Sequence, residues 1–578
     1  MKRKLVTPFL IITFLLIDAP TTYIHAQKLQ WAKGAGSTGA DESLNVATDA
    51  SGNVYATGWF QGTMDFDPSS AIFNLTSGDG SKDIFITKLD ASGNFIWARA
   101  MGGNDEDYGQ ALTVDALENV FITGYFNETA DFDPGAATFN MTSAGFEDIF
   151  ILRLDASGNF VWARRIGGPM GDYGTSLALD GNGNVYTTGR FSETADFDPG
   201  AGTYDLTSAG GDDIFVSKLD PSGNFLRAER MGGSSMDYAN GITADPTGVV
   251  TVTGSFGGTC DFDPSADSLN LTSLGLLGDA YVFKLGAAGN LLWAKAFNGL
   301  DHGDSFGIAS DAAGNVYTTG AYFGTVDFDP GADTYNLIGV STYDIFVSKL
   351  DASGNFVWAK GMGGVSIQKG FSIGLDGAGN VYTAGQFSTT VDFDPGPAVF
   401  NITSTGEYDI FISKLDPSGN FVWASKMGGP GVDVCLSIAV HSSGNIYATG
   451  RFELTADFDP GTGTNNLVSV GSDDIFISKL DGVLVSIDDQ TEIQEINIYP
   501  NPCNGIFAIR NKDLKGSSVE IFNVMGESVH KQIIDQGKLT TDVDLSDQPG
   551  GMYFIRIVAN QGSATRDRLR NHAILLMK

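Results

Sequence analysis

The sequence predicts an all-β protein in which seven copies of one unit form a ring. The tetrapeptide DFDP begins at seven positions spaced 65 or 66 residues apart: Asp65, Asp131, Asp196, Asp261, Asp327, Asp392 and Asp457. The composition, with 42% hydrophobic residues, 11% aromatic residues and 75 glycines, suits a large core with many tight turns. A unit repeated seven times at one period indicates a repeat architecture and not several unrelated domains.

The first 26 residues are predicted to be a signal peptide. Residues 2–4 are positively charged, residues 9–17 form an apolar run, and the stretch ends at the small Ala26, after which we place the cleavage. A buried N-terminal strand is the alternative interpretation. The apolar run is too short to cross a bilayer of about 30 Å, so we expect no transmembrane segment in the mature chain.

Each unit contains four runs with the character of β-strands. In the third unit they are residues 175–180, 184–191, 213–220 and 224–231. Strands one and two, and strands three and four, are joined by D-x-x-G-N turns such as residues 49–53 and 90–94. Asp can cap such a turn, and Gly can adopt its left-handed conformation. Four antiparallel strands repeated radially are the plan of a β-propeller blade.

The two ends of the repeat region predict how the ring closes. The last unit stops at its third strand, residues 474–481, while a spare copy of the fourth strand lies at residues 28–36. That copy carries Trp31, and the other fourth strands carry Trp97, Trp162, Trp293, Trp358 and Trp423, with Arg227 in the remaining one. We therefore expect residues 27–483 to form a seven-bladed β-propeller whose last blade is completed by the N-terminal strand, which also covers an exposed sheet edge. An open solenoid would gain nothing from this offset.

Residues 183–191 (GNVYTTGRF) and 213–225 (DIFVSKLDPSGNF) resemble the bacterial β-propeller repeat family known as SBBP. The resemblance covers roughly residues 28–481. It implies the fold but no common reaction, because the family is defined by its architecture.

Strand direction assigns the connections to two faces. The D-x-x-G-N turns lie on one face, and the connections from strand two to three and from strand four to one lie on the other, which we call the loop face. An Asp precedes strand one at Asp41, Asp107, Asp172, Asp237, Asp304 and Asp433, and Gln368 replaces it once. Long loops on one side of a repeat array usually carry binding, so we expect the loop face to be the working surface.

The DFDP segments are candidate calcium sites. In an extended D-F-D segment both carboxylates lie on one side, about 7 Å apart, and hard oxygen ligands suit Ca²⁺. The candidate metal ligands are Asp65, Asp67, Asp131, Asp133, Asp196, Asp198, Asp261, Asp263, Asp327, Asp329, Asp392, Asp394, Asp457 and Asp459. The other interpretation is structural, because the third acidic ligand of a calcium loop is missing. In this interpretation one Asp faces solvent, the next caps a turn before Pro, and the Phe fills the core.

Charge restricts the partners. Residues 27–492 carry 21 Lys and Arg against 59 Asp and Glu, a net charge of −38, whereas residues 493–578 carry 10 against 9. Such an acidic body repels nucleic acid and anionic membranes. Cations and basic surfaces are better partners.

Catalytic patterns are weak. His302 and His441 are expected on opposite faces, and the three cysteines Cys260, Cys435 and Cys503 form neither a disulfide framework nor a metal spacing.

The D-x-S-G-N-F-x-W stretches look similar to the Asp-box of sialidase-like propellers, but their spacing is one residue longer. A sialidase would need an arginine cluster on the working face, where only Arg190 and Arg451 are expected. The fourth-strand Trp residues are expected to pack between blades and not to bind sugars.

The last 84 residues predict a second domain. After an acidic linker at 484–494, strand-like runs at 496–510, 518–531 and 550–559 indicate a small β-sandwich over residues 495–578. Its motifs resemble the C-terminal sorting domain of the type IX secretion system of Bacteroidota, through Pro500, Asn501, Pro502, Gly505, Gly526, Gly551 and Tyr553. The resemblance implies recognition by that machinery, export through the periplasm, and a secreted or surface-attached product after removal of the domain.

Three functions remain open from the sequence. The first is a non-catalytic surface propeller that binds a glycan, a protein or divalent cations through its acidic loop face. The second is a secreted glycoside-active hydrolase or lyase, which a pocket with clustered Arg, Glu and Tyr would favour. The third is a structural component of a surface coat.

Overall fold

The computed structural model describes residues 28–275, 278–340, 342–481, 497–499, 505–510, 518–523, 528–533, 540–549, 551–559 and 568–576. The chain divides into two compact units, residues 1–486 and 487–578. The predicted signal peptide and linker lie outside the described residues. Within the described ranges, no helix has the length and apolar character needed to cross a membrane, and a single 3₁₀ turn, η1, covers Gly78–Gly80.

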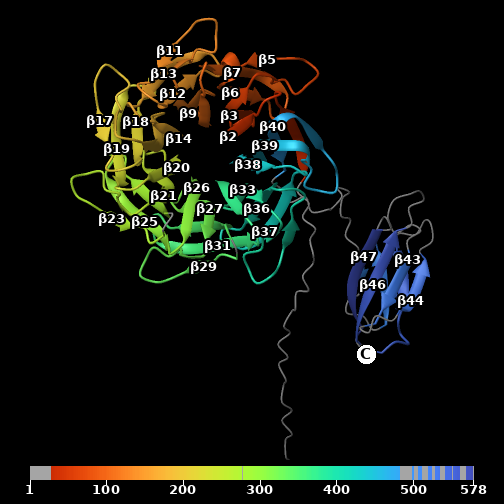
Figure 1. The fold of residues 1–578 in the computed structure, drawn as a ribbon. Coiled ribbons are helices and arrows are strands. Elements are labelled where there is room, and N and C mark those ends of the chain that lie inside the picture. Colours follow the sequence, from red (N-terminus) through yellow and green to blue (C-terminus); the bar gives the residue numbers. More distant parts are fainter. Residues whose placement is uncertain are drawn as a thin grey trace, which may run out of the picture. The chain divides into compact units, whose positions relative to one another are not determined.

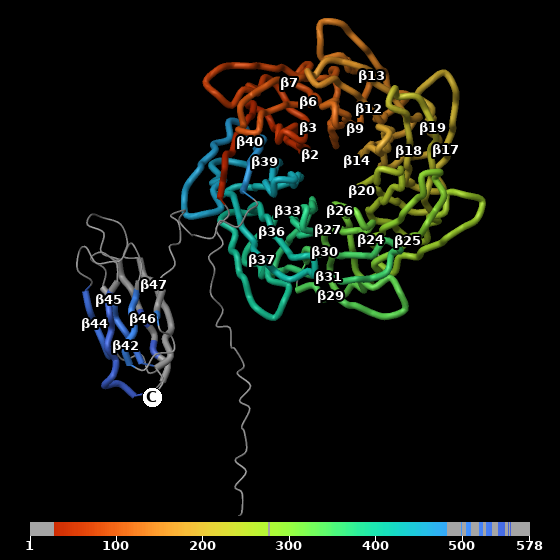
Figure 2. The backbone as a smooth tube through the Cα atoms, turned by 180° about the vertical axis from the view of Figure 1, so that it is seen from behind, coloured from red at the N-terminus to blue at the C-terminus, as the bar shows by residue number. Residues whose placement is uncertain are grey.

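Seven antiparallel blades surround a central axis (Figure 1; Figure 2 from behind), which confirms the predicted propeller. Blade 1 is β2 (Glu42–Thr48), β3 (Val54–Gln61), β6 (Lys82–Leu89) and β7 (Phe95–Gly103); blade 2 is β8 (Tyr108–Val114), β9 (Val120–Phe126), β12 (Asp148–Leu154) and β13 (Phe160–Ile166); blade 3 is β14 (Tyr173–Leu179), β15 (Val185–Phe191), β18 (Asp213–Leu219) and β19 (Phe225–Gly233). Blade 4 is β20 (Asp237–Ala244), β21 (Val250–Phe256), β24 (Asp279–Leu285) and β25 (Leu291–Gly299); blade 5 is β26 (His302–Ser310), β27 (Val316–Phe323), β30 (Asp344–Leu350) and β31 (Phe356–Gly364). Blade 6 is β32 (Gln368–Leu375), β33 (Val381–Phe387), β36 (Asp409–Leu415) and β37 (Phe421–Met427), and blade 7 is β38 (Val434–Val440), β39 (Ile446–Asp457), β40 (Asn466–Leu480) and β1 (Leu29–Ala35).

The ring closes as the sequence predicts. Strand β1 pairs antiparallel with β40, with Trp31 opposite Lys479 and Gly34 opposite Phe476. In Figure 1 the red N-terminal strand accordingly lies among the blue strands of blade 7. Backbone groups at the edge of β40 are thereby paired within the chain and are not left open to another molecule.

The hydrophobic core lies between neighbouring blades. Strands two and three are apolar and buried along most of their length; for example, Phe121 and Ile149 of blade 2 pack in one cluster with Val185 and Phe215 of blade 3. Strand one has a β-bulge at the same place in every blade, such as between Gly174 and Ser176. Each bulge leaves one residue unpaired beside the axis.

The DFDP insertions fold into small hairpins: β4 (Thr63–Asp65) with β5 (Asn74–Thr76), β10 (Thr129–Asp131) with β11 (Asn140–Thr142), β16 (Thr194–Asp196) with β17 (Asp205–Thr207), β22 (Thr259–Asp261) with β23 (Asn270–Thr272), β28 (Thr325–Asp327) with β29 (Asn336–Ile338), and β34 (Thr390–Asp392) with β35 (Asn401–Thr403). In blade 7 the hairpin is part of β39 and β40. The hairpins lie along the outer edge of the ring (Figure 1).

Each hairpin from blade 2 onwards also bridges two blades. It pairs with the end of strand four of the preceding blade, as β10 does with β7 through Ala130 and Gly103. Equivalent pairs occur at the other five junctions from blade 2 to blade 7. Among the described residues, the junction between blade 7 and blade 1 has no such pair, because β4 pairs with β5 alone. We call this junction the seam.

The second unit contains two sheets. One has the order β41 (Asn497–Tyr499), β42 (Ile506–Arg510), β45 (Thr540–Asp544), and the other the order β44 (Ser528–Ile533), β43 (Ser518–Phe522), β46 (Gly551–Ala559), β47 (Arg568–Leu576). Phe507 and Val543 of the first sheet share one core with Val519, Ile521 and Ile555 of the second.

Candidate functional site

The turns opposite the loop face are held by their own aspartates. In most of them one carboxylate accepts hydrogen bonds from the backbone; Asp220 Oδ1 accepts from Ser222 N at 2.8 Å and Asn224 N at 2.9 Å. Gly286 and His441 take the Asp position in two of the turns. The hydrogen bond from Asn224 N is the main reason why the pKa of Asp220 is lowered. The glycine of the same turn, Gly223, has a φ of 77°, as expected for a left-handed position.

The DFDP aspartates are used in the same way. In the second unit, Asp131 Oδ1 accepts from Asp133 N at 3.0 Å and from Phe139 N at 2.8 Å, and Asp133 Oδ1 accepts from Gly135 N at 2.8 Å. Phe132 between them is buried. Equivalent bonds recur in the other six units. These carboxylates therefore close the hairpins.

Pairing to strand four of the neighbouring blade holds these hairpins at the outer edge of the ring. Among the described residues, no group of three or more His, Cys, Asp or Glu side chains is close enough to hold a metal. Calcium binding at the DFDP segments stays a prediction, which melting curves in calcium and in EDTA would test.

The Asp before strand one is a buried clamp. Asp107 Oδ2 accepts from Gly103 N at 2.8 Å, and its Oδ1 accepts from Asn127 N at 3.2 Å, so it ties two loops of the same face together. Asp41, Asp172, Asp237 and Asp433 do the same in their blades. The sequence pattern located these residues, and the structure shows that they hold the fold.

A second set of buried aspartates lies at the start of strand three and was not predicted from the sequence. Its members are Asp83, Asp148, Asp213, Asp279, Asp344, Asp409 and Asp474. Each accepts a backbone hydrogen bond from the end of the hairpin insertion; Asp148 Oδ2, for example, accepts from Ala144 N at 2.9 Å. The repeated D-I-F motif was the available signal.

The two sets compensate for each other. In blade 5 the clamp position is held by Gly303, whose N donates to Gly278 O as Asp107 N does to Lys82 O. The predicted Asp304 stands one residue further on, where its Oδ2 lies 2.8 Å from His302 Nε2, and in blade 6 Gln368 holds the clamp position. At these two junctions the strand-three aspartate accepts the orphaned backbone bond: Asp279 Oδ1 from Gly299 N and Asp344 Oδ1 from Gly364 N.

Burial raises the pKa of most of these clamps. That of Asp107 rises to about 8, through burial and through the nearby Asp83 and Asp105 carboxylates, although backbone hydrogen bonds oppose the rise. Those of Asp172, Asp237 and Asp433 rise to about 7 for the same main reason. The abundant acid of the propeller is thus in large part structural.

The sevenfold regularity breaks near the axis on the loop face. Where strands one and two pair at this end, blades 1 to 4 present Trp59, Tyr108, Tyr125, Tyr173, Arg190 and Tyr238, which we call the mouth arc. Blades 5 to 7 have Asp304, Lys369, Gln386 and Arg451 at the equivalent positions together with small or aliphatic residues.

The members of the mouth arc contact one another across blades. The ring centroids of Tyr108 and Tyr125 are 4.8 Å apart, and those of Tyr125 and Tyr173 are 4.9 Å apart. The Arg190 guanidinium carbon lies 4.4 Å from the ring centroid of Tyr173 and 4.9 Å from that of Tyr238. These are attractive cation–π distances. The result is a continuous row of half-buried aromatic side chains.

Charged groups of both signs flank the row. Lys82 Nζ donates to Tyr108 Oη at 2.8 Å, and Tyr108 Oη donates to Glu106. Glu147 Oε2 accepts from Tyr173 Oη at 3.2 Å. Burial raises the pKa of Tyr108 and of Tyr173, and it raises that of Tyr125 to about 12. These phenols are therefore protonated at neutral pH.

A cavity of about 310 Å³ lies on the axis and is lined by strand one of all seven blades. The unpaired bulge residues Leu44, Gln110, Thr175, Asn240, Phe306, Phe371 and Leu436 line it. Tyr108, Tyr173 and Tyr238 each precede one of these residues by two positions. The mouth arc and the channel are therefore neighbouring parts of one region.

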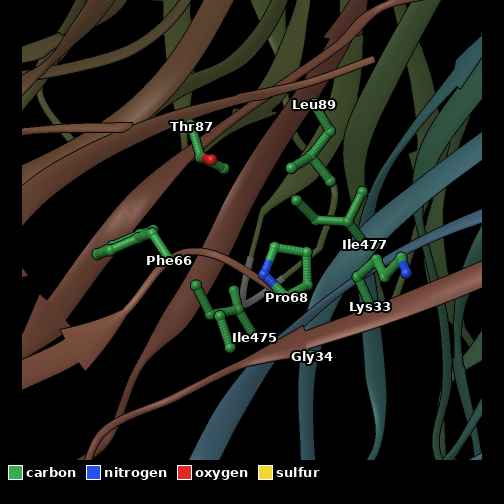
Figure 3. A pocket seen from close by; sticks show the side chains of 9 residues that line it. Lys33, Gly34, Phe66, Pro68, Thr87, Leu89, Ile475 and Ile477 are labelled. Atoms are coloured by element: carbon green, nitrogen blue, oxygen red, sulfur yellow. The ribbon is translucent and has the colours of Figure 1, made fainter. Parts of the chain in front are cut away.

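A second cavity lies at the seam (Figure 3). Its lining includes Ala35, Phe66, Pro68, Leu89 and Ile475. With about 20 Å³ it has room for about one water molecule. It is a packing defect and not a ligand site.

Potential catalytic side chains are dispersed in the described part of the chain. His302 is buried against Asp304, and His441 Nδ1 lies 2.8 Å from Ser443 Oγ in a turn of blade 7. Cys260 and Cys435 are buried and unpaired; Cys503 lies outside the described residues. The tryptophans bind between blades: Trp97 Nε1 donates to Ala156 O of the next blade at 3.3 Å.

Of the predicted sorting residues, Pro500, Asn501, Pro502 and Gly526 lie outside the described residues. Gly505 has a φ of 121°, and its carbonyl accepts from Leu545 N at 2.6 Å. Tyr553 is buried, with its Oη donating to Pro549 O at 2.7 Å. Gly551 begins β46.

The ring of blades and the axial region define a seven-bladed β-propeller with a separate C-terminal unit. Residues 161–190 match the family model of the beta-propeller repeat, and residues 497–569 match that of the secretion system C-terminal sorting domain. The chain thus combines a propeller, one repeat of which matches the beta-propeller repeat family, with a C-terminal region that matches the secretion sorting domain, which implies secretion.

Relatives are distant. An uncharacterized WD repeat-containing protein of Acanthamoeba polyphaga mimivirus is 25% identical over 76% of this chain and 37% of its own length, and the regulatory protein FlaEY of Caulobacter vibrioides is 25% identical over 73% and 44%. The chain thus spans less than half of these relatives. The ulvan lyase NLR42 of Nonlabens ulvanivorans is 30% identical over 18% of this chain and 20% of its own. A solved structure of RRP9 WD40 repeats has a TM-score of 0.40 and 10% identity, covering 79% of this chain and 99% of that one.

Proposed function

We propose that the propeller is a non-catalytic binding module that holds an extracellular protein partner on its loop face. The observation that supports this most is the mouth arc, a non-repeating row of aromatic and arginine side chains on a scaffold whose repeated polar groups maintain the fold. Trp, Tyr and Arg are the residue types that dominate binding energy at protein interfaces.

Exposed apolar side chains lie on the same face as the mouth arc. Met170, Met236, Leu300 and Val365 lie in successive connections from strand four to strand one, with exposed fractions of 36%, 58%, 77% and 70%. Large apolar side chains clustered on one face of a secreted protein indicate an interaction surface. Because the propeller carries a net charge of −38 over residues 27–492, a neutral or basic partner suits it best.

The test compares two double variants of the full mature chain as baits in pull-downs from extracellular fractions. Tyr173→Ala with Arg190→Ala should lose a protein that the wild type captures, with at least a tenfold lower yield. The control, Phe139→Ala with Phe400→Ala on the outer hairpins, should retain it. Equal capture by both variants would contradict the proposed surface.

We further propose that the sorting domain is removed on export and that the propeller remains attached to the cell surface. The support is the match over residues 497–569. Deletion of residues 493–578 should leave the propeller in the periplasm, as fractionation would show. Surface display of the truncated chain would contradict this proposal.

One observation favours an enzyme as the second candidate: Lys82, Tyr108 and Glu106 form a connected polar group beside the axis. Because the pKa of Tyr108 is raised, its phenol stays protonated at neutral pH and is a poor general base. Incubation with neutral and uronic polysaccharides would test this candidate; product formation that is lost in Tyr108→Phe would support it.

A further inference from the structure

The axial channel has two unlike halves. Blades 5, 6, 7 and 1 contribute Phe306, Phe371, Leu436 and Leu44, and blades 2, 3 and 4 contribute Gln110, Thr175 and Asn240. Both sets are contiguous, so four apolar bulge residues face three polar ones, while the neighbouring Asn45, Ser372 and Ser437 add polar groups on blades 1, 6 and 7. A channel that served only to close the ring would need no such division.

The geometry places one amide opposite two aromatic rings. Phe306 and Phe371 belong to neighbouring blades, and their ring centroids are 5.4 Å apart. In a ring of seven, the blade opposite the boundary of blades 5 and 6 is blade 2, which carries Gln110. A ligand across the channel would therefore contact the phenyl pair on one side and a carboxamide on the other.

The polar wall is partly held in place by its neighbours. Asn240 Nδ2 donates to Ser305 O at 2.9 Å, and Thr175 Oγ1 donates to Ala239 O at 2.7 Å. Gln110 hydrogen-bonds Tyr125 of the mouth arc. The amide oxygen of Asn240 has no partner among the described hydrogen bonds. Fixed amides with an acceptor to spare favour a ligand rich in hydroxyl groups.

We propose that this channel binds a neutral sugar residue, entering through the mouth arc. A pyranose has an apolar C–H face, which suits Phe306 and Phe371, and a rim of hydroxyls, which suits Gln110 and Asn240. The volume of about 310 Å³ matches a small ligand. None of the residues that line the cavity is charged, and the acidic propeller repels an anionic sugar.

The proposal goes beyond partner binding on the loop face and is tested separately. The full mature chain is titrated with the methyl glycosides of glucose, galactose, mannose and N-acetylglucosamine, and with glucuronate, followed by saturation-transfer NMR. At least one neutral glycoside should bind, and glucuronate should bind at least tenfold more weakly.

Two channel variants and one control complete the test. Phe371→Ala and Gln110→Leu should each weaken the bound glycoside at least tenfold, while Phe139→Ala on an outer hairpin should leave it unchanged. Gln110→Leu preserves side-chain size and loses only the hydrogen bond to Tyr125, so its melting temperature should fall only slightly. The proposal is overturned if no neutral glycoside binds, if glucuronate binds as tightly, or if Gln110→Leu binds like the wild type. Protein capture that depends on Tyr173 and Arg190 would survive any of these results.

Discussion

Aspartate has opposite electrostatic roles at the two ends of each blade. In the turns between strands three and four its carboxylate is accessible to solvent and accepts several hydrogen bonds, which favour the charged form, so that the pKa of Asp220 and of Asp351 is lowered. In the loop-face clamps burial dominates and the pKa of Asp107 rises to about 8. The residue type and its capping role are alike, and only the degree of burial differs.

The clamps predict an unusual dependence of stability on pH. Because their folded pKa values of about 6 to 8 exceed the unfolded value of about 3.9, folding favours the protonated form. Their contribution is complete below about pH 4 and is lost as pH rises through 6 to 8. The turn aspartates, with lowered pKa, lose their contribution only as pH falls below about 4. We therefore expect the melting temperature to be highest near pH 5 and to fall toward pH 8.

Melting curves from pH 3 to pH 9 would check this, with Asp107→Asn as the comparison. Between pH 5 and pH 8 that variant should lose less stability than the wild type, since it lacks one of the titrating clamps. A melting temperature that rises steadily from pH 5 to pH 8 would contradict the account.

The Trp of strand four gives a second prediction. Trp358 Nε1 donates to Pro417 O of the next blade at 3.2 Å, and the ring is buried. Trp358→Phe removes the hydrogen bond and keeps an aromatic ring, so we expect a loss of about 1 kcal/mol in the free energy of unfolding, plus a smaller packing term. Denaturant unfolding would measure it. The exposed neighbour Val357→Ala should change stability by less than about 0.5 kcal/mol, and equal effects of the two variants would refute the inter-blade role.

At the scale of the element, strand β1 differs from the other fourth strands. Ala35 stands where they carry large buried side chains: Met101, Ile166, Met231, Phe297, Met362 and Met427. The seam also lacks the hairpin pair found at the other junctions of the described ring. The junction made by residues most distant in sequence is thus the least tightly packed.

Ala35→Met should stabilise the propeller by about 1 kcal/mol, because it fills the seam cavity with the side chain the other blades use. The reciprocal change Met101→Ala should cost about 2–5 kcal/mol. Unfolding in urea would compare them. A lower stability of Ala35→Met would show that Pro68 already occupies the space.

At the scale of the whole molecule, closure makes the ring cooperative. Removal of residues 27–35 leaves the edge of β40 unpaired and takes Trp31 and Ala35 out of the core between blades 7 and 1. We expect broad, early melting and self-association, measured by calorimetry and light scattering. A synthetic peptide of residues 27–37 should restore the monomer. A truncated chain that stays monomeric and melts like the wild type would contradict ring closure by β1.

The repeat period, turn motifs and displaced strand in the sequence predicted the number of blades, their strands and the closure. The four strands expected in residues 175–231 agree with β14, β15, β18 and β19 within a few residues. These features are local or periodic, so each copy reports the same structure. The sorting domain was recognisable for a similar reason, from short motifs in fixed order.

The candidate site was not predictable in the same way. Comparing repeats emphasises what they share, and here the shared aspartates hold the fold, whereas Tyr108, Tyr173, Arg190 and Phe371 stand at positions that vary. Only the closed ring brings positions on different blades, such as Tyr108 and Tyr173, which are 65 residues apart, to one axis. The sequence thus determined the propeller, because its repeats encode local hydrogen bonds and strand periodicity. The tertiary structure alone decided which side chains meet, because that depends on the order of blades around the ring and on burial.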